Sequence, residues 1–182
     1  MPYEPPPELA GLSLSQIAEA VAARKLPPVD QWSPDASGDS EMRIARDGTW
    51  FHQDSEITRP AMVRAFASLL IRDRTGQHWL MTPYQKLTIA VEDAAFIAVD
   101  MQQSEGALAF RLNTDDIVLA GPEHPIIARG DSDTPALYLD VRHGCEARLN
   151  RSTYAQIAEH SASLGDGWSV QSQGAEFSLL PG

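Results

Sequence analysis

The chain has 182 residues, of which 43% are hydrophobic and 21% charged, a balance typical of a globular protein of one or two small domains. Its 14 Lys and Arg residues against 25 Asp and Glu residues give a net charge of −11, which argues against duplex nucleic acid or an anionic membrane as a partner. The longest strictly apolar run, residues 94–99, is far too short to span a membrane. With one cysteine, Cys145, and no basic and apolar leader, the sequence predicts a cytoplasmic location.

Residues 1–28 are expected to form a proline-rich, extended lead-in followed by one helix over 14–24. Ser13 and Gln16 have the spacing of a capping box, in which each side chain accepts a hydrogen bond from the backbone of the other residue. The apolar side chains of this helix fall on one face, so we expect the helix to dock on the rest of the protein. Pro27 ends it, because proline cannot continue a helix from within.

Residues 29–85 are expected to form an N-terminal α+β domain. The dipeptide Asp47-Gly48 between alternating residues is a strong signal for a β-hairpin, and Pro60 suits the first turn of a helix. The predicted elements, in order, are a loop over 29–40, a hairpin of strands 42–46 and 49–53, a helix over 59–73 capped by Thr58, and a strand over 78–82.

Residues 86–182 are expected to form a mainly antiparallel β roll or barrel with one helix. Short stretches with a period of two are separated by Gly, Pro, Asn and Asp, which is typical of such a meander. The predicted strands are 87–91, 96–101, 107–112, 117–120 and 126–128, then a hairpin of 137–142 and 145–149, a helix over 151–161, and strands 168–172 and 177–180.

The hairpin and helix near the end of the chain match those near its beginning. The turn 46–48 (Arg-Asp-Gly) corresponds to 142–144 (Arg-His-Gly), and the segment before each helix ends in an arginine, Arg59 or Arg151. Because the order of elements and the residues before the helices agree together, we predict a duplication. The expected fold class is α+β, with two small, closely packed domains that share a duplicated hairpin–helix–strand motif.

Three signatures carry a resemblance to a known family: 46–52 (Arg-Asp-Gly-Thr-Trp-Phe-His), 82–86 (Thr-Pro-Tyr-Gln-Lys) and 91–96 (Val-Glu-Asp-Ala-Ala-Phe). Together they resemble the bacterial domain-of-unknown-function family DUF1285, which has proline where this chain has Ala95. The resemblance implies a duplicated core and a C-terminal half superficially like a pleckstrin-homology barrel. It also implies a cleft between the halves that holds a nucleotide-like ligand, and a role in signal transduction rather than catalysis.

The candidate ligand-binding residues follow from the charges and aromatic rings near that expected cleft. A lysine suits a phosphate, an acidic pair suits a ribose hydroxyl or a hydrated cation, and an arginine at a helix start suits an anion. An aromatic ring from the first domain would stack on a base, although core packing is the ordinary role of such a ring. The predicted ligand-binding residues are Trp50, His52, Arg59, Thr82, Lys86, Glu92, Asp93 and Phe96.

Two other classes of function stay open. One is a protein-interaction adaptor in signalling that uses its sheet edges or first helix. The other is a hydrolase of a phosphorylated metabolite with a metal at Glu92 and Asp93, although no catalytic or cofactor-binding motif occurs in the sequence. Cys145 and His143 lie two residues apart and have the chemistry of a dyad, yet a buried cysteine is commonly only a small apolar residue. We therefore predict a non-enzymatic binding protein without a cofactor or metal.

Overall fold

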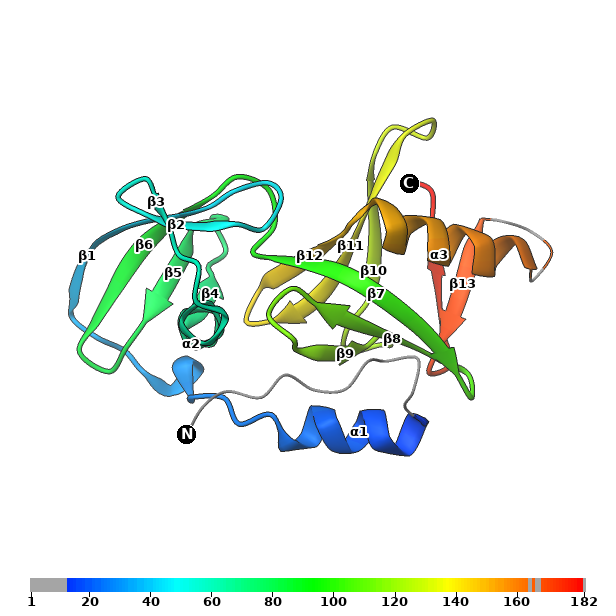
Figure 1. The fold of residues 1–182 in the computed structure, drawn as a ribbon, viewed down its shortest axis with the longest axis horizontal. Helices are drawn as coiled ribbons and strands as arrows, with labels where there is room; N and C mark the ends of the chain where they lie inside the picture. Colours follow the sequence, from blue (N-terminus) through cyan, green and yellow to red (C-terminus); the bar gives the residue numbers. More distant parts are fainter. Residues whose placement is uncertain (1–12, 164, 166–167, 182) are drawn as a thin grey trace.

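The protein consists of two six-stranded sheets placed side by side (Figure 1). The computed structural model describes residues 13–163, 165 and 168–181, so the predicted proline-rich lead-in lies outside the described residues. The first sheet holds β1 (Ala36–Ile44), β2 (Trp50–His52), β3 (Ser55–Glu56), β4 (Leu70–Arg72), β5 (His78–Met81) and β6 (Gln85–Val91). The second holds β7 (Phe96–Ser104), β8 (Ala107–Leu112), β9 (Ile117–Leu119), β10 (Ile126–Gly130), β11 (Pro135–Arg142) and β12 (Cys145–Leu149).

Three α-helices, one 3-10 turn and a hairpin complete the described chain. The helices are α1 (Leu14–Ala23), α2 (Pro60–Ala67) and α3 (Arg151–Ser163), the 3-10 turn is η2 (Val29–Gln31), and the hairpin is β13 (Ser169–Ser172) with β14 (Ala175–Ser178). The protein is thus α+β in two halves, with mostly β structure. No described helix is both long and apolar enough to cross a bilayer.

The two sheets have the same strand order relative to the chain. The first runs β3-β2-β1-β6-β5-β4 and the second, read from the opposite edge, runs β9-β8-β7-β12-β11-β10. Each sheet joins its first and last strands in parallel, β1 with β6 and β7 with β12, while its other pairs are antiparallel. This order aligns β1 with β7. The sequence match of hairpin 42–53 with 137–149 was therefore wrong, because those hairpins hold different places in the two sheets.

The first sheet is longer than the sequence predicts. β1 begins at Ala36, inside the predicted loop 29–40, because parallel pairing with β6 supplies partners for its backbone from Ala36↔Gln85 onward. A bulge interrupts this pairing near Glu41, which has a positive φ of 58°. The sheet also includes β6, so it extends past residue 85, where the sequence analysis ended the first domain.

The second helix is shorter than predicted. α2 ends at Ala67, and the apolar residues that follow form the edge strand β4 on β5. A short apolar run fits a helix or a strand equally well, which is why the prediction over 59–73 was too long. Thr58 is not its N-cap. Arg59 holds that position without a side-chain hydrogen bond, and Pro60 occupies the first turn as expected.

The first helix follows its prediction closely. In α1, Ser13 Oγ accepts a hydrogen bond from the backbone N–H of Gln16, and Gln16 Oε1 accepts one from the N–H of Ser13, so the capping box is present. Ile17 is fully buried against Ala109 and Ile117 of the second half. The helix therefore docks on the second half, along β9 (Figure 1).

One hydrophobic core runs through both halves. Trp50 and Leu70 of the first half belong to the same buried cluster as Phe96, Phe110 and Leu139 of the second. The halves also meet through backbone, because the Arg72 N–H on β4 donates to His143 O in the β11–β12 turn at 2.9 Å. At this joint Gly144 has a φ of +81°, and a Cβ on it would lie 2.5 Å from the Arg72 carbonyl oxygen.

We expect Gly144→Ala to loosen the joint between the halves. Gly174 in the β13–β14 turn is a matched control, because it has a φ of +80° and no atom within 4 Å of its Cβ position. Both substitutions carry the strain of a positive φ, about 1–2 kcal/mol. Gly144→Ala also makes the new Cβ overlap with the Arg72 backbone. We therefore expect it to lower the free energy of unfolding by about 1–3 kcal/mol more than Gly174→Ala does. Urea denaturation of both variants measures this, and equal losses would contradict the close contact.

Candidate functional site

A cavity of about 680 Å³ lies between the two halves. The β1–β2 turn of the first half contributes Arg46 and Asp47 to its wall. The second half contributes the end of β12 and the start of α3, including Arg148, Asn150 and Arg151. The volume lies within the range of small-molecule sites, and side chains from both halves would contact the same bound molecule.

Asp93, in the link between β6 and β7, fixes one of these arginines. Its carboxylate accepts a hydrogen bond from Arg148 Nη1 at 2.8 Å and another from the Tyr138 hydroxyl at 2.7 Å. Burial alone would raise the pKa of Asp93, but these two donors and the charge of Arg148 lower it below its usual value. The same pairing raises the pKa of Arg148. Both groups are therefore charged at neutral pH, and Arg148 is held against the wall.

The other two arginines have exposed side chains and carry charge toward the cavity. The structure records no hydrogen bond or ion pair for the side chains of Arg46 and Arg151 within the residues it describes. Arg151 is the first residue of α3, and Asn150 caps that helix by accepting a hydrogen bond from the Thr153 N–H at 2.9 Å. A helix N-terminus favours an anion, and a guanidinium can bind a phosphate or carboxylate with two parallel hydrogen bonds.

None of the eight ligand-binding residues predicted from the sequence is among the described residues that line this cavity. Asp93 adjoins it through Arg148. Lys86 and Glu92 stand at the two ends of β6, six residues apart, and an extended strand places such residues about 20 Å from one another. Lys86 Nζ lies 4.4 Å from the centre of the Trp79 ring. Glu92 accepts a hydrogen bond from the backbone N–H of Arg46 at 2.9 Å. The structure therefore does not bring Lys86 and the acidic pair together.

The remaining predicted residues serve the fold or face solvent. Phe96 is fully buried beneath the Arg142 guanidinium, and Thr82 closes the β5–β6 turn by donating its hydroxyl to Gln85 O. His52 and Arg59 are exposed on the first half. Trp50 is only 1% exposed and lies beside Phe66, with ring centroids 6.4 Å apart.

A smaller hollow of about 280 Å³ lies between the β1–β2 turn, the start of α2 and the β8–β9 turn. Trp50 is among its lining residues, as are Thr58 and Pro60 on either side of Arg59. Trp50 thus lies at the boundary between the halves. No pattern in the sequence marked Arg46, Arg148 and Arg151 as a group. The signal for Arg46 was its place in the 46–52 signature, and the signal for Arg151 was its place at the start of a predicted helix.

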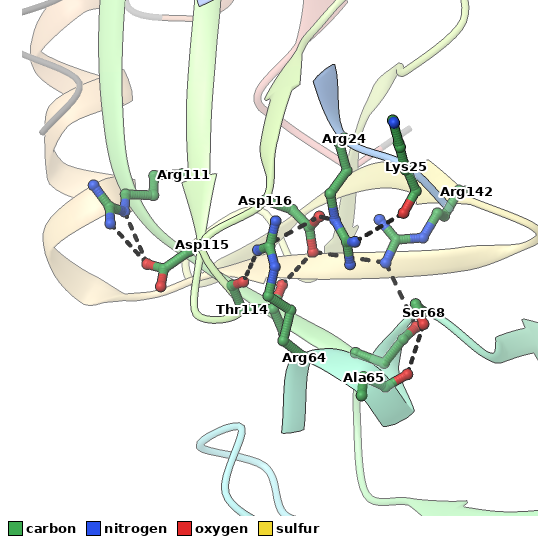
Figure 2. A network of polar contacts seen from close by, with 11 residues as sticks. Arg24, Lys25, Arg64, Ala65, Ser68, Arg111, Thr114, Asp115, Asp116 and Arg142 are labelled. Atoms are coloured by element: carbon green, nitrogen blue, oxygen red, sulfur yellow. Dashed lines mark hydrogen bonds and ion pairs between the residues drawn. The ribbon is translucent and has the colours of Figure 1, made fainter. Parts of the chain in front are cut away.

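A second polar cluster lies at the meeting point of α1 and the two halves (Figure 2). Asp116, only 3% exposed, faces three arginines: its Oδ1 lies 2.7 Å from Arg24 Nε and 4.0 Å from Arg64 Nη1, and its Oδ2 lies 3.6 Å from Arg142 Nη2. We refer to Asp116, Arg24, Arg64 and Arg142 as the Asp116 cluster. Arg24 follows α1, Arg64 lies on α2 and Arg142 ends β11, so the cluster connects three separate segments.

The electrostatics of the Asp116 cluster keep its carboxylate ionised. Burial alone would raise the pKa of Asp116, but Arg142, the Thr114 hydroxyl and Arg24 together lower it. Burial lowers the pKa of Arg142, although the neighbouring carboxylate opposes that shift. Asp116 therefore compensates part of the charge of these arginines in a largely dry environment.

The structure argues against a cysteine nucleophile. Cys145 is fully buried on β12, and this burial raises the pKa of its thiol to about 12. The thiolate is the nucleophilic form, so the side chain is unreactive at neutral pH. His143 lies in the β11–β12 turn with a φ of 50°. Among the described residues, no group of three or more His, Cys, Asp or Glu is placed to hold a metal ion.

Two family models together match 27–179. The N-terminal domain model, described as "Domain of unknown function (DUF1285), N-terminal domain", matches 27–94. The model described as "Protein of unknown function (DUF1285), C-terminal domain" matches 95–179. The chain is thus a two-domain protein of mostly β structure, and it belongs to the DUF1285 family, as its three sequence signatures had indicated.

Two solved structures of this family resemble the chain. A DUF1285 family protein from Silicibacter pomeroyi DSS-3 is 39% identical, with a TM-score of 0.77, and the match covers 93% of this chain and 95% of that one. A DUF1285 family protein from Shewanella baltica OS155 is 22% identical, with a TM-score of 0.53 over 65% of this chain and 90% of that one, and this likeness shows the fold alone. None of the curated proteins matches the chain.

We expect Asp116→Asn to destabilise the protein strongly, because it leaves three largely buried guanidiniums without their shared carboxylate. Breaking such a buried pair lowers the free energy of unfolding by about 3–5 kcal/mol. Asp115→Asn is a matched control. Asp115 also pairs with an arginine, Arg111, at 2.8 Å, but its side chain is 24% exposed, so we expect a loss of about 1 kcal/mol or less. Urea denaturation compares the two, and similar losses would contradict a central role for Asp116.

Proposed function

We propose that the protein binds a small, anionic, nucleotide-like ligand in the cavity between its two halves. The observation that carries this proposal is the convergence of Arg46, Arg148 and Arg151 on one cavity of about 680 Å³, together with the N-terminus of α3. Arg46 comes from one half and the other two from the second half. The lining holds three arginines against two aspartates, Asp47 and Asp133, so its charge is positive in a chain whose net charge is −11, and this favours an anion.

The other lining residues suit the neutral parts of such a ligand. Ile97, Leu137 and Leu149 provide apolar surface, and the ring of Tyr154 offers a face on which a base can stack. Asp47 and Asp133 provide carboxylate oxygens that can accept hydrogen bonds from sugar hydroxyls. In this arrangement the phosphate contacts Arg46, Arg151 and the start of α3, while Asp93 keeps Arg148 in place.

A ligand in this position would act as a signal rather than as a substrate. It contacts both halves at once, so its binding free energy adds to the stability of their contact. We propose on this ground a sensing role in bacterial signal transduction, in the cytoplasm and without catalysis. A protein partner would then read the ligand-bound form.

The common strand order of the two sheets supports a further part of this proposal, namely that the halves arose by duplication. Each half joins its first and last strands in parallel at the centre of its sheet. The duplicated unit we propose is β1–β6 and β7–β12. The helices differ, since α2 lies between β3 and β4 whereas α3 follows β12 within the second half. We also propose that this second half is superficially similar to a pleckstrin-homology barrel.

The experiment is thermal unfolding of the chain against a panel of nucleotides and cyclic dinucleotides, with and without magnesium. A ligand at about 100 times its dissociation constant stabilises the native state by roughly 2.7 kcal/mol, which raises the unfolding temperature by several degrees. We expect one compound to raise the unfolding temperature in a dose-dependent way. Arg151→Glu should abolish this rise and Lys86→Glu should preserve it, because Arg151 lines the cavity and Lys86 does not.

Two results would count against this assignment. If Lys86→Glu alone abolishes the shift, the ligand binds at the β5–β6 end of the first sheet and not between the halves. If no compound shifts the unfolding temperature, the nucleotide-like ligand is wrong. Capture of a protein partner that depends on residues 14–21 would then favour the adaptor.

A further inference from the structure

One edge of β1 has no partner strand over the first half of its length. β2 pairs with β1 only from Met42 to Ile44, whereas β6 pairs along the opposite edge from Ala36 onward. Beside residues 36–40 the described chain therefore supplies no strand on the β2 side, and we refer to this side of 36–40 as the β1 edge. Figure 1 shows this part of β1 at the outer side of the first sheet. Such an edge presents backbone groups with which another extended segment can pair.

The backbone groups of Ser37 and Asp39 point to the β1 edge. The carbonyl oxygen of Gln85 accepts a hydrogen bond from the residue after β5, so Gln85 turns its backbone toward β5. Successive residues of a strand alternate between its two edges, and Lys86 and Thr88 therefore face β1. In parallel pairing such residues bond to the neighbours of their register partners, which are Ser37 and Asp39. The N–H and C=O groups of these two partners are left on the outer side.

These four backbone groups are accessible. Residues 36–39 are all exposed, and within the part of the chain that the structure describes no hydrogen bond is recorded for the N–H or C=O of Ser37 and Asp39 on this side. The β1 edge thus offers two donors and two acceptors, enough for a short extended segment.

The two faces of the sheet differ at this place. Side chains alternate along a strand, so Ser37 and Asp39 lie on one face and Ala36 and Gly38 on the other. On the second face, a Cβ on Gly38 would lie 3.3 Å from the side chain of Leu87, which packs against the hydrophobic core. A segment that pairs here would therefore meet polar side chains on one face and apolar surface on the other.

Four acidic residues surround the β1 edge. Asp35 precedes β1, Asp39 lies on it, and Glu41 stands at the bulge. Asp54 follows Gln53, whose backbone N–H donates to Glu41 O at 2.9 Å, so the β2–β3 turn borders the end of the edge. Among the described residues, no ion pair is recorded for any of the four acidic side chains.

The cations of the neighbouring strands are engaged elsewhere. Lys86 is the register partner of Ser37, but its Nζ lies 4.4 Å from the centre of the Trp79 ring on β5, at the opposite edge of β6. Arg43 pairs with Glu92 at 3.4 Å. The β1 edge is therefore acidic. A second copy of this chain would bring the same negative charge to a shared edge and be repelled, whereas a basic segment would be attracted.

We propose that the β1 edge binds an extended, basic segment of a partner protein, which adds to the first sheet as a further strand. Its backbone pairs with Ser37 and Asp39, its lysine or arginine side chains at every second position meet the acidic residues, and the side chains between them cover the face of Leu87. In this mode of recognition backbone hydrogen bonds provide affinity and alternate side chains provide specificity. The inference does not depend on the nucleotide-like ligand proposed above.

The test is fluorescence anisotropy with a dye-labelled peptide, Lys-Val-Lys-Val-Lys, blocked at both ends. The peptide Glu-Val-Glu-Val-Glu has the opposite charge on the same backbone. The lysine peptide methylated at every backbone nitrogen has the same charge but no backbone donor. We expect saturable binding of one lysine peptide per protein and at least tenfold weaker binding of both controls. No saturable binding of the lysine peptide, or equal affinity for its methylated form, would overturn the proposal.

Two double variants separate the β1 edge from the net charge of the chain. Asp35→Asn with Asp54→Asn removes two acidic groups beside the edge, and asparagine tolerates the φ of 64° at position 54. Glu105→Gln with Glu159→Gln removes two exposed acidic groups of the second half. We expect the first pair to weaken binding of the lysine peptide at least fivefold and the second pair to change it less than twofold. Equal losses would show that net charge alone attracts the peptide.

Amide hydrogen exchange with and without saturating lysine peptide locates the added strand. The N–H groups of Ser37 and Asp39 should exchange at least tenfold more slowly with the peptide bound, because each gains a hydrogen-bond acceptor or is shielded from water. Amides of the β13–β14 hairpin serve as the control and should keep their rates. Unchanged exchange at Ser37 and Asp39 with the peptide bound would show that it binds elsewhere.

Discussion

The contact between one buried carboxylate and three arginines holds the parts of this protein together. Asp116 is 3% exposed, and its partners come from the segment after α1, from α2 and from the end of β11. None of these segments neighbours another in the sequence. Without the carboxylate, three positive charges would share one poorly hydrated space and repel one another. Asp116 therefore contributes to the relative placement of α1, the first half and the second half, together with the shared hydrophobic core.

Asp93 has a comparable role in the link between the two halves. It joins Arg148 on β12 and Tyr138 on β11 to the end of the first half, and the loss of water around it is offset by two short hydrogen bonds. Asp93 thus fixes Arg148, and Asp116 contacts Arg24, Arg64 and Arg142. Arg148 lines the cavity between the halves, whereas Arg24 and Arg142 line a cavity beside α1. Arginines that stabilise the fold are consequently also part of the walls of both cavities.

Local signals in the sequence predicted the local structure well. The capping box of α1 and the Asp47-Gly48 hairpin involve residues close in the chain, and both are present. The early start of β1 and the conversion of Leu70–Arg72 into a strand were missed, because each depends on a partner strand distant in sequence. Propensity alone cannot show which strand will supply the hydrogen bonds.

The same limitation applies to the candidate site. The sequence predicts that an arginine at a helix start, Arg59, borders the cleft, whereas the larger cavity between the halves has Arg151 at the start of α3. The type of group was predictable from helix chemistry. Its position was not, because it follows from how β12 pairs with β7 and presents α3 to the first half. The Asp116 cluster joins residues up to 118 positions apart, from Arg24 to Arg142, and no sequence pattern predicted it.

Native-state hydrogen exchange of Asp116→Asn, compared with the unmodified chain, tests the central role of this carboxylate most directly. If Asp116 attaches α1 and α2 to the second half, backbone amides of both helices should exchange at least tenfold faster in the variant. The exchange rates of the amides in the β13–β14 hairpin, which has no residue in the Asp116 cluster, should increase less. Faster exchange confined to the β8–β9 turn around Asp116 would contradict the account, because the loss would then be local and the three segments would be held together by other contacts.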